Sequence, residues 1–591
     1  MTGVLGGTVT GEPFRAMTEA IQFEPWYETE RFEEGESSLG LVHHGERDPL
    51  GSAAWEGESR AGVVHGALVG REHTNTENLV ERVLDSPHET LREVDGPFAL
   101  ACVDFDAERF VLATDKLGTR PCYYTLENGL AFGSSVAALL TGLDDPQLDE
   151  QGVSDLLMMS GLWGERTLVE GVRALAPASV LEYEDGEASI ERYWKPDYES
   201  APTDGYIDDL VDVFGAAMAD AATTMDGDVG VWLSGGLDSR TLAAELAGHS
   251  DEFDSFRAYT YDANPRGGGN PELAADIADR LDMGFSEVEI SPDRFVPILD
   301  DAIDRTDGMV GWATLLPLSA TYNLPEANAD VMLEGAGQGG LMGHHVRRRH
   351  IERCDSAVDS LYRSEAGASR ERVRSLMTTD VDPLDSFRET VAGSDETQRK
   401  KVILDAHFAN HYGRGEYAST RLAQTKTGVR APIVHGDLIQ HAARLPTTYR
   451  MGTIPLTNGY VPHGVTKPKL ALTRAAGKGM GDVRYERTGV APKHSYPVHV
   501  GGFVATTSLG RLRSSTTYGG QRLPDIWYRR HDSLRDRLDD LLAGACERSF
   551  LNGDEIRRLR REHLAGEANH MSGVLSPVTT LESWLRRHLD P

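Results

Sequence analysis

The residues with the clearest chemical potential form a short turn between a predicted strand and a predicted helix. An apolar run over residues 229–233 stops abruptly, and helical spacing begins at Thr241. The turn between them reads Ser234-Gly235-Gly236-Leu237-Asp238-Ser239. A helix N-terminus offers backbone N–H groups and partial positive charge to an anion, and glycine lets the backbone approach a phosphate closely. We therefore interpret this turn, the Ser-Gly-Gly loop (residues 234–239), as a phosphate-binding loop.

Asp238 adds a metal ion to this interpretation. A carboxylate repels phosphate unless a divalent cation lies between them, so Asp238 is a predicted Mg²⁺ ligand. The loop contains no lysine and so differs from the Gly-x-x-x-x-Gly-Lys loop of kinase-like NTPases. The predicted nucleotide contacts in this region are Leu233, Ser234, Gly235, Gly236, Leu237, Asp238 and Ser239. The alternative is a tight turn of an α/β sheet that happens to contain two glycines.

Length and charge restrict the class of protein. A chain of 591 residues with 40% hydrophobic residues predicts more than one domain. No apolar run approaches the roughly 20 residues of a membrane span, and the first residues lack the features of a signal peptide. We therefore expect a cytoplasmic protein that does not enter a membrane.

The charge balance is strongly acidic and poor in lysine. Asp and Glu number 93 against 59 Lys and Arg, a net charge of −34, and only nine of the cations are lysines. Such a surface suits a cytoplasm rich in potassium salt, where the Debye length is about 3 Å at 1 M, and it repels nucleic acid. We expect a halophilic protein; an ordinary acidic protein is the alternative. The four scattered cysteines predict reduced, buried side chains.

The pattern of elements divides the chain in two. Residues 1–195 read as a β-rich unit, with strands expected over residues 61–69, 98–105, 109–114, 121–126 and 130–133. A polar, proline-containing linker follows over residues 195–205. From residue 206 to 591, helices alternate with strands over residues 229–233, 256–261, 286–290 and 331–333, and the chain becomes mainly helical after about residue 340. This alternation predicts a parallel sheet covered by helices.

These features together resemble the glutamine-hydrolysing asparagine synthetase family. The resemblance rests on the Ser-Gly-Gly loop, which looks like that of the ATP pyrophosphatases, and on the amino-terminal segments 95–100, 114–124, 132–135 and 173–177. It implies an α+β sandwich of the class II glutamine amidotransferase (Ntn) type. An α/β parallel-sheet ATP-pyrophosphatase domain of the adenine nucleotide alpha hydrolase type, with a helical carboxyl-terminal part, would follow. Asp115 and Arg120 are expected to form a buried pair that braces a turn.

The resemblance also implies further site residues. Tyr261 ends a strand where the family contacts adenine, Glu272 fits an acidic residue near the substrate, and Gly335 begins a second glycine-rich loop. Arg487 stands near the family's charge-stabilising lysine, although a guanidinium cannot lend a proton. Segments 430–437, 469–474 and 486–489 resemble carboxyl-terminal family motifs.

Two departures from the family pattern bear on chemistry. Thr2 stands where the family has its nucleophilic cysteine, and His65-Gly66-Ala67 replaces Asn-Gly-Glu of the oxyanion site. An N-terminal threonine can act as a nucleophile, but the loss of one oxyanion donor costs about a hundredfold in rate or more. We therefore predict an inactive glutaminase domain.

The second departure concerns the second glycine loop (residues 335–343). Gly339 and Gly340 stand where the family has an Asp-Glu pair, so the second Mg²⁺ ligand is missing. Because Mg²⁺ is held by one or two carboxylates plus phosphates and water, Asp238 alone is one solution. Glu334, just before the loop, is another candidate ligand and catalytic residue.

We therefore expect a ligase that uses ATP and Mg²⁺ to adenylate a carboxylate, releasing pyrophosphate, before ammonia or another amine displaces AMP. Aspartate is the default substrate by resemblance, and a homodimer is compatible with this interpretation. The alternatives are an amidotransferase acting on a sugar or another carboxylate, a non-catalytic ATP-binding homologue, and a Thr2-dependent hydrolase. The basic stretch His344–His350 predicts a surface helix, with a metal or phosphate site as its alternative.

Overall fold

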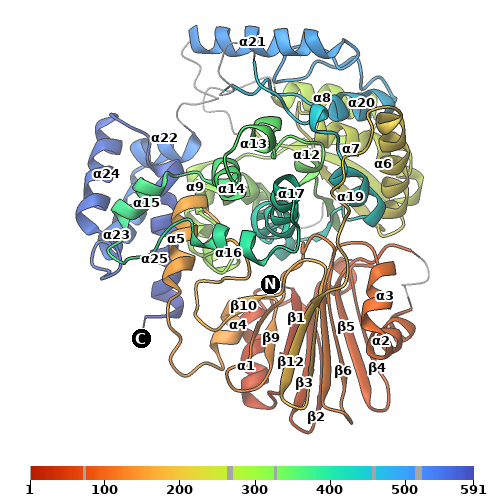
Figure 1. Cartoon of the computed structure of the whole chain (residues 1–591), viewed down its shortest axis with the longest axis vertical. Helices are drawn as coiled ribbons and strands as arrows, with labels where there is room; N and C mark the ends of the chain where they lie inside the picture. The colour runs from red at the N-terminus through yellow and green to blue at the C-terminus, as the bar shows by residue number, and fades with distance from the viewer. Residues whose placement is uncertain are drawn as a thin grey trace.

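The computed structural model describes residues 2–48, 50–70, 75–262, 270–324, 329–454, 461–512 and 522–590. Figure 1 shows a β-sandwich at one end of the molecule and a larger, mainly helical part at the other. Residues 193–205 have no regular secondary structure and connect the two parts. Within the described residues, no helix is long and apolar enough to cross a lipid bilayer.

The amino-terminal part contains two six-stranded sheets, ordered β10-β8-β9-β1-β3-β2 and β12-β11-β7-β6-β5-β4. Neighbouring strands in both sheets pair antiparallel. The strands are β1 (Gly3–Gly7), β2 (Glu28–Glu34), β3 (Ser37–His43), β4 (Ser52–Glu56), β5 (Arg60–Gly66), β6 (Phe98–Asp104), β7 (Arg109–Thr114), β8 (Tyr123–Thr125), β9 (Ala131–Gly133), β10 (Arg173–Ala174), β11 (Ser179–Glu184) and β12 (Glu187–Arg192).

Strand β6 shows how this sandwich is held together. Alternate residues of a strand face opposite sides of a sheet. Ala101 and Val103 therefore join the buried cluster between the sheets, whereas Leu100 and Cys102 pack in the cluster beneath α2 (Thr76–Asp85) and α3 (Pro87–Glu93). On the other sheet, α1 (Glu12–Ile21) and α4 (Val136–Leu140) cover the outer face. Helices thus flank both sheets.

The second part is built on a five-stranded parallel sheet with the order β15-β14-β13-β16-β17. Its strands are β13 (Asp228–Trp232), β14 (Ser255–Thr260), β15 (Gly284–Glu287), β16 (Val331–Leu333) and β17 (Gly428–Arg430). The carboxyl ends of parallel strands meet at one edge, where α/β proteins bind ligands. The loops that follow β13 and β16 therefore begin side by side.

Helices surround this sheet and extend away from it (Figure 1). Those used below are α6 (Tyr206–Ala222), α7 (Asp238–Leu246), α8 (Asn270–Arg280), α10 (Leu299–Asp304), α13 (Arg348–Glu352), α14 (Ala357–Glu365), α16 (Asp385–Gly393), α17 (Arg399–Asn410), α18 (Tyr417–Thr420), α20 (Lys467–Ala475), α23 (Asp532–Ala545), α24 (Gly553–Ala565) and α25 (Ser576–His588). The helices predicted over the carboxyl-terminal residues correspond to α23, α24 and α25, which form a separate lobe with α10.

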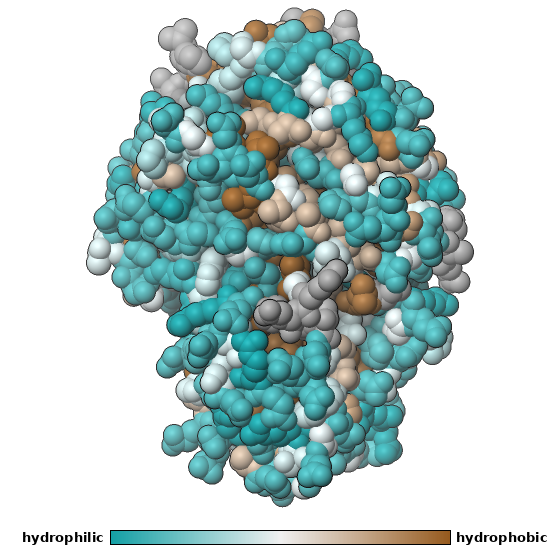
Figure 2. All heavy atoms as spheres, turned by 90° about the vertical axis from the view of Figure 1, so that its right-hand side faces the viewer, coloured by the Kyte–Doolittle hydropathy of each residue, from teal (hydrophilic) through white to brown (hydrophobic). Residues whose placement is uncertain are grey.

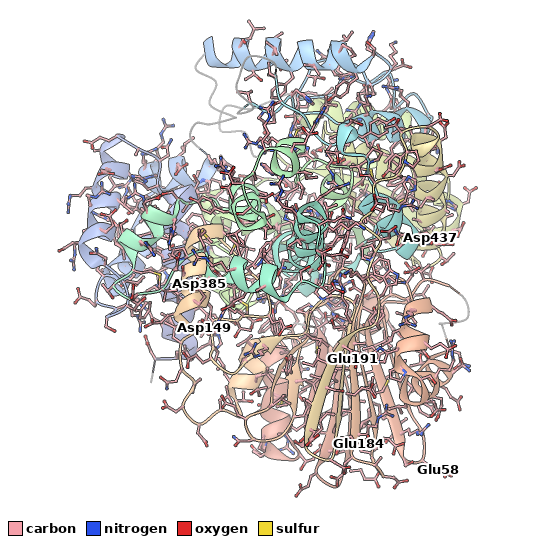
Figure 3. The ribbon with its side chains drawn as sticks, viewed as in Figure 1. Glu58, Asp149, Glu184, Glu191, Asp385 and Asp437 are labelled. Carbon is pink, nitrogen blue, oxygen red and sulfur yellow. The ribbon has the colours of Figure 1, made fainter. Side chains whose placement is uncertain are left out.

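Acidic side chains are exposed on the surface of both parts. Figure 3 labels Glu184 and Glu191 on the sandwich and Asp385 on α16, and their side chains are 54%, 73% and 46% exposed. In Figure 2 one face is mostly hydrophilic, and its apolar residues gather in a central vertical band. Adaptation to salt remains a prediction.

Motif residues of the sandwich hold the two parts of the chain together through hydrogen bonds. Asp95 accepts hydrogen bonds from the Gly436 N–H (2.9 Å) and from Lys116 Nζ (2.6 Å). The Gly96 N–H donates to the Val434 carbonyl (3.1 Å). The segment around Asp95 therefore joins the sandwich to the loop between β17 and the next helix.

The expected pair between Asp115 and Arg120 is only half right. Asp115 braces the turn by accepting hydrogen bonds from the Leu117 N–H (2.9 Å), the Thr119 N–H (3.0 Å) and Thr119 Oγ1 (2.6 Å). Arg120 instead crosses to the second part, where Nη2 donates to the Val429 carbonyl (2.6 Å). No hydrogen bond joins Asp115 to Arg120 within the described residues, because the backbone already fills the carboxylate's acceptor sites.

A buried ion pair ties three segments together at the same junction. Arg421 Nη2 lies 2.6 Å from Asp307 Oδ2, and the two side chains are 3% and 0% exposed. The other carboxylate oxygen accepts from Ser135 Oγ of the sandwich (2.5 Å). Each charge depends on the other, because an unpaired charge inside a protein is costly.

Replacing Arg421 with methionine should lower the free energy of unfolding by about 3–5 kcal/mol, since the Asp307 charge would stay buried without its partner. Equilibrium unfolding in urea measures this loss. Arg444→Met is the control: its Nε lies 3.9 Å from Asp197 and its side chain is 44% exposed, so we expect a change within about 0.5 kcal/mol. Equal losses in both variants would contradict the assignment.

Candidate active site

A cleft of about 510 Å³ opens at the carboxyl edge of the parallel sheet. The Ser-Gly-Gly loop after β13 and the residues that follow β16 form two of its walls. Three basic side chains, His344, Lys469 and Arg487, reach it from distant parts of the sequence. The cleft thus combines the loops predicted to bind phosphate with cationic side chains.

The Ser-Gly-Gly loop is folded on itself by hydroxyl and amide groups. Ser239 Oγ accepts from the Ser234 N–H (3.1 Å) and lies 3.0 Å from Ser234 Oγ. The Gly236 N–H donates to Ser234 Oγ (3.2 Å), and the Gly235 N–H donates to Asn270 Oδ1 (2.7 Å). Helix α7 starts at Asp238, so the loop lies at a helix N-terminus, where an anion is favoured.

Arg240 anchors this loop from inside the protein. Its side chain is fully buried, and its guanidinium donates to the carbonyls of Gly235 (3.0 Å), Val483 (2.7 Å) and Arg484 (3.0 Å). These carbonyls belong to the loop and to the segment that leads to Arg487. Arg240 therefore fixes two walls of the cleft relative to each other.

Asp238 and Lys469 meet at the centre of the site. Lys469 Nζ lies 2.5 Å from Asp238 Oδ2, and the lysine side chain is 6% exposed. The other carboxylate oxygen, Oδ1, is buried and has no hydrogen-bond partner within the described residues. A Cβ atom added at Gly339 would lie 3.0 Å from Lys469 Nζ and 3.3 Å from Asp238 Oδ2. Gly339 thus leaves room for the lysine beside the aspartate.

Glu334 lies in the same cleft. Its Oε1 accepts from the Ala336 N–H (2.9 Å), and burial raises the pKa of the carboxyl group to about 7. Burial and the nearby Glu334 charge raise the pKa of Tyr261 to about 12. Glu334 therefore changes its charge near neutral pH.

His344 and Arg487 complete the basic side of the cleft. His344 Nε2 lies 3.3 Å from Arg487 Nη1. Burial, together with the charges of Lys469 and Arg487, lowers the pKa of His344 to about 2. A neutral imidazole therefore stands beside two permanent cations, an arrangement suited to phosphate or carboxylate groups.

The remaining predicted residues lie around this centre. Leu233 is buried in the core behind the loop, and Gly335 lines the cleft. The Tyr261 carbonyl accepts from Asn270 Nδ2 (3.3 Å), which links it to the Ser-Gly-Gly loop. Glu272 is exposed in the first turn of α8 and is not part of the cleft wall; residues 263–269 before it lie outside the described residues.

The stretch His344–His350 does not form the expected surface helix. Helix α13 begins only at Arg348, and His350 is 1% exposed. His344 enters the cleft, whereas His345 Nε2 lies 2.9 Å from Glu365 Oε1 on the other side of the chain. The prediction was wrong for residues 344–347, where the chain bends before the helix begins.

Thr2, at the position of the family's nucleophilic cysteine, is buried in the sandwich at 3% exposure. Burial and the charge of Arg120 hold the pKa of His65 well below its usual range, and burial lowers that of His44 to about 4. His65, which replaces the family's asparagine, is therefore a neutral imidazole. Loss of glutaminase activity remains a prediction.

Both parts of the chain match known protein families. A glutamine amidotransferase domain profile matches residues 65–194, and an asparagine synthase profile matches residues 209–478. The chain therefore carries a glutamine amidotransferase domain followed by an asparagine synthase domain. Among similar proteins, asparagine synthetase [glutamine-hydrolyzing] 3 of Bacillus subtilis is 28% identical over 252 residues, covering 38% of this chain and 40% of that protein.

More distant relatives extend the match. A putative asparagine synthetase [glutamine-hydrolyzing] of Mycobacterium tuberculosis strain H37Rv is 25% identical over 395 residues, covering 63% of this chain and 56% of its own length. The chain therefore spans about half the length of these two relatives. A solved glutamine phosphoribosylpyrophosphate amidotransferase of B. subtilis covers 49% of this chain and 91% of its own, with 10% identity and a TM-score of 0.24. That likeness is too low to support an argument.

The sequence does not identify one central residue of the cleft. Lys469 stands only within a segment that resembles a family motif, and Arg487 is the predicted charge-stabilising group. Both side chains line the cleft, and Lys469 is the one that contacts Asp238. Local sequence gives no signal for this role, because Lys467 lies in the same first turn of the helix and is exposed.

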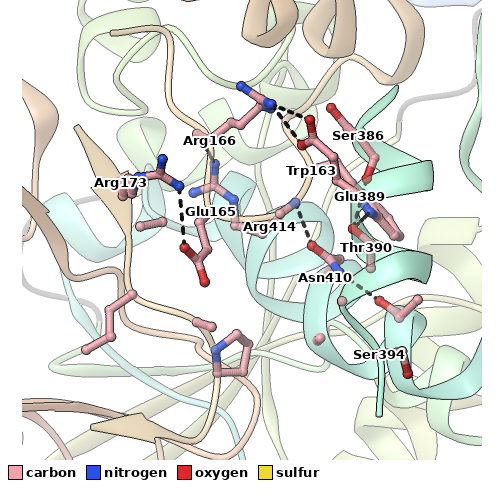
Figure 4. A pocket seen from close by; sticks show the side chains of 18 of the residues that line it. Trp163, Glu165, Arg166, Arg173, Ser386, Glu389, Thr390, Ser394, Asn410 and Arg414 are labelled. Carbon is pink, nitrogen blue, oxygen red and sulfur yellow. Dashed lines mark hydrogen bonds and ion pairs between the residues drawn. The ribbon is translucent and has the colours of Figure 1, made fainter. Parts of the chain in front are cut away.

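A second cavity, of about 420 Å³, lies between the two parts of the chain (Figure 4). Arg166 of the sandwich side faces Glu389 of α16 at 2.8 Å, and Trp163 Nε1 donates to Thr390 Oγ1 (2.9 Å). The Gly164 N–H donates to Asn410 Oδ1 (2.6 Å). These paired side chains hold the two parts together, and none of the motif residues of the cleft lines this cavity.

Replacing Arg240 with lysine should destabilise the protein by about 1–3 kcal/mol, because one ammonium group cannot serve the spread of buried carbonyls that a guanidinium reaches. The thermal midpoint and ATP affinity should both fall, since the Ser-Gly-Gly loop loses its anchor. Arg280→Lys is the control. Arg280 lies on an exposed helix face, where its Nε is 3.0 Å from Asp276 Oδ1. An unchanged thermal midpoint in Arg240→Lys would refute the anchoring role.

Proposed function

We propose that this protein is an ATP-dependent ligase that adenylates a carboxylate, releases pyrophosphate and then joins the acyl group to ammonia or another amine. The observation that supports this most is the contact of 2.5 Å between Lys469 and Asp238 at the Ser-Gly-Gly loop. It places a cation at the N-terminus of α7, where the phosphates of ATP would bind. The asparagine synthase profile covers this same region.

Each group of the cleft has a defined part in this reaction. The N–H groups and hydroxyls of the Ser-Gly-Gly loop turn from their internal partners to the phosphates. Lys469 and Arg487 stabilise the charge that develops as the substrate carboxylate attacks the α-phosphate and pyrophosphate leaves. Fixed charges of this kind supply much of an enzyme's rate enhancement, since they need no rearrangement in the transition state.

The site also fits Mg²⁺. The unpartnered Oδ1 of Asp238 is a buried oxygen of the type that Mg²⁺ prefers, and Glu334 offers a second carboxylate in the same cleft. When bound, the ion would neutralise phosphate charge. Asp238 would then give up part of its contact with Lys469, which would free the ammonium group for the phosphates.

Aspartate is the default acid, because the relatives carry the name asparagine synthetase. The pair His344–Arg487 at one side of the cleft suits a second carboxylate of such a substrate. Other carboxylates remain alternatives within this proposal, because Gly339 and Gly340 alter the loop that borders the substrate.

Lys469→Met should reduce kcat for AMP and pyrophosphate formation by about 100- to 1,000-fold, because it removes a preorganised charge. The assay contains ATP, Mg²⁺, ammonium and aspartate in concentrated KCl, with AMP, pyrophosphate and asparagine as readouts. Lys467→Met is the matched control on the same helix; its Nζ lies 4.9 Å from the Tyr449 ring centre and outside the cleft wall.

The same assay separates the alternatives. If AMP forms only with another acid, that acid and not aspartate is the substrate. ATP binding without AMP formation would indicate a non-catalytic homologue. Glutamine in place of ammonium should give no product if the sandwich is an inactive glutaminase. Glutamate release that Thr2→Ala abolishes would overturn that expectation.

Glu334 predicts a pH dependence of Mg²⁺ activation. Its pKa near 7 leaves the carboxyl group protonated below neutral pH, so the Mg²⁺ concentration for half-maximal activity should fall as pH rises to about 7, by up to tenfold per unit. Glu334→Gln should abolish this slope. Glu245→Gln is the control, because burial also raises the pKa of Glu245 but its side chain lies outside the cleft wall. A slope that persists in Glu334→Gln would exclude this carboxylate as the ligand.

A further inference from the structure

A second cluster of chemically reactive side chains lies behind the second glycine loop, outside the cleft. It consists of His345, Glu365, His407 and His411, and their ligand atoms all lie within 4.8 Å of one another. No sequence motif of the ATP site includes these four residues. We call them the histidine cluster.

Three separate elements bring the histidine cluster together. His407 lies in α17, and His411 begins the π-helical turn that follows it, so the two residues share one face at a spacing of four. Glu365 is the last residue of α14. His345 comes from the bends that follow the second glycine loop. Single π-helical turns are frequently found at functional sites, where they redirect side chains.

The distances suit a small cation at the centre. Glu365 Oε1 lies 2.9 Å from His345 Nε2 and 3.7 Å from His407 Nδ1, and Glu365 Oε2 lies 3.2 Å from His411 Nδ1. Zinc–nitrogen bonds of 2.0–2.1 Å in a tetrahedron place neighbouring ligand atoms about 3.3 Å apart. The observed separations lie around this value.

His407 shows that protein groups alone leave the cluster incomplete. Its side chain is 1% exposed, and neither ring nitrogen has a hydrogen-bond partner within the described residues. An unsatisfied buried polar group costs about 1–3 kcal/mol. Glu365 lies within 3.2 Å of His345 and His411, but its oxygen is 3.7 Å from His407 and too far to accept a hydrogen bond. A bound cation would accept a lone pair from each of the three imidazoles.

We propose that the histidine cluster binds a divalent transition metal, with Zn²⁺ as the ion, through His345, His407, His411 and Glu365. Three imidazoles and one carboxylate match Zn²⁺ and do not match Mg²⁺ or Ca²⁺, which take oxygen ligands. Four protein ligands close the coordination sphere, as in structural zinc sites. His345, at 28% exposure, leaves a path by which the ion enters.

The metal would stabilise the wall of the ATP cleft from behind. His345 is the neighbour of His344, which lines the cleft. His411 Nε2 lies 3.3 Å from Glu416 Oε1, and Glu416 also lines the cleft. Such outer contacts orient a ligating imidazole and are part of many metal sites. The same turn places the Tyr412 ring against the second glycine loop, with its hydroxyl 3.1 Å from a Cβ built at Gly340.

The test measures metal content and affinity of the full-length, tag-free protein. We expect zinc in a one-to-one ratio with the chain by mass spectrometry. After removal of the metal with a chelator, Co²⁺ should give the intense visible absorption of a four-coordinate site. Glu365→Gln keeps the side-chain volume and should weaken zinc affinity by about 100-fold; His407→Ala should abolish the Co²⁺ spectrum.

His435→Ala is the matched control, because His435 is also buried and lies 3.1 Å from the carboxylate of Asp220, but belongs to no group of potential metal ligands among the described residues. It should retain zinc. The proposal is overturned if the wild-type chain neither contains zinc nor binds Co²⁺ with that spectrum. It is equally overturned if folded Glu365→Gln binds zinc as tightly as the wild type. Both readouts are independent of ligase activity.

Discussion

The contact between Lys469 and Asp238 is the constraint on which the active-site region depends. A buried ammonium group needs a counter-charge, so the first turn of α20 must lie beside the first turn of α7. One turn farther along both helices, Thr473 Oγ1 lies 2.8 Å from Thr241 Oγ1. The two helices are thereby fixed side by side, and Asp238, at the end of the Ser-Gly-Gly loop that starts α7, takes its place from this pairing.

Gly339 follows from the same constraint. A larger side chain there would meet the ammonium and the carboxylate together. Loss of an acidic residue from the second glycine loop therefore coincides with room for the cation, and the charges of Lys469 and Asp238 balance before any nucleotide binds. In the proposed reaction, incoming phosphates would alter that balance, because they would offer the ammonium group a second, stronger partner. The pair is thus a resting state suited to exchange.

The sequence predicted those features that local pattern determines. The apolar run before residue 234 and the glycines after it indicate a strand, a turn and a helix, and β13 and α7 have these positions. Strand β17, with only three residues, and the role of Lys469 could not be predicted, because each depends on contacts with residues far away in the sequence. Glu365 and His407 carry no motif, and the packing of α14 against α17 brings them together.

Buried ion pairs differ from surface pairs in how strongly salt screens them. In concentrated salt, charges on the surface are screened within about 3 Å at 1 M, whereas buried pairs are screened much less. Arg421–Asp307 and Lys469–Asp238 are pairs of the second kind, with at least one partner almost fully enclosed. The chain places its few lysines accordingly: Lys469 and Lys116 are buried beside carboxylates that join separate segments. Asp307 accepts from Ser135 Oγ and Asp95 accepts from the Gly436 N–H, so two of these carboxylates also join the two parts. We expect salt to weaken these buried contacts less than the pairs on the surface.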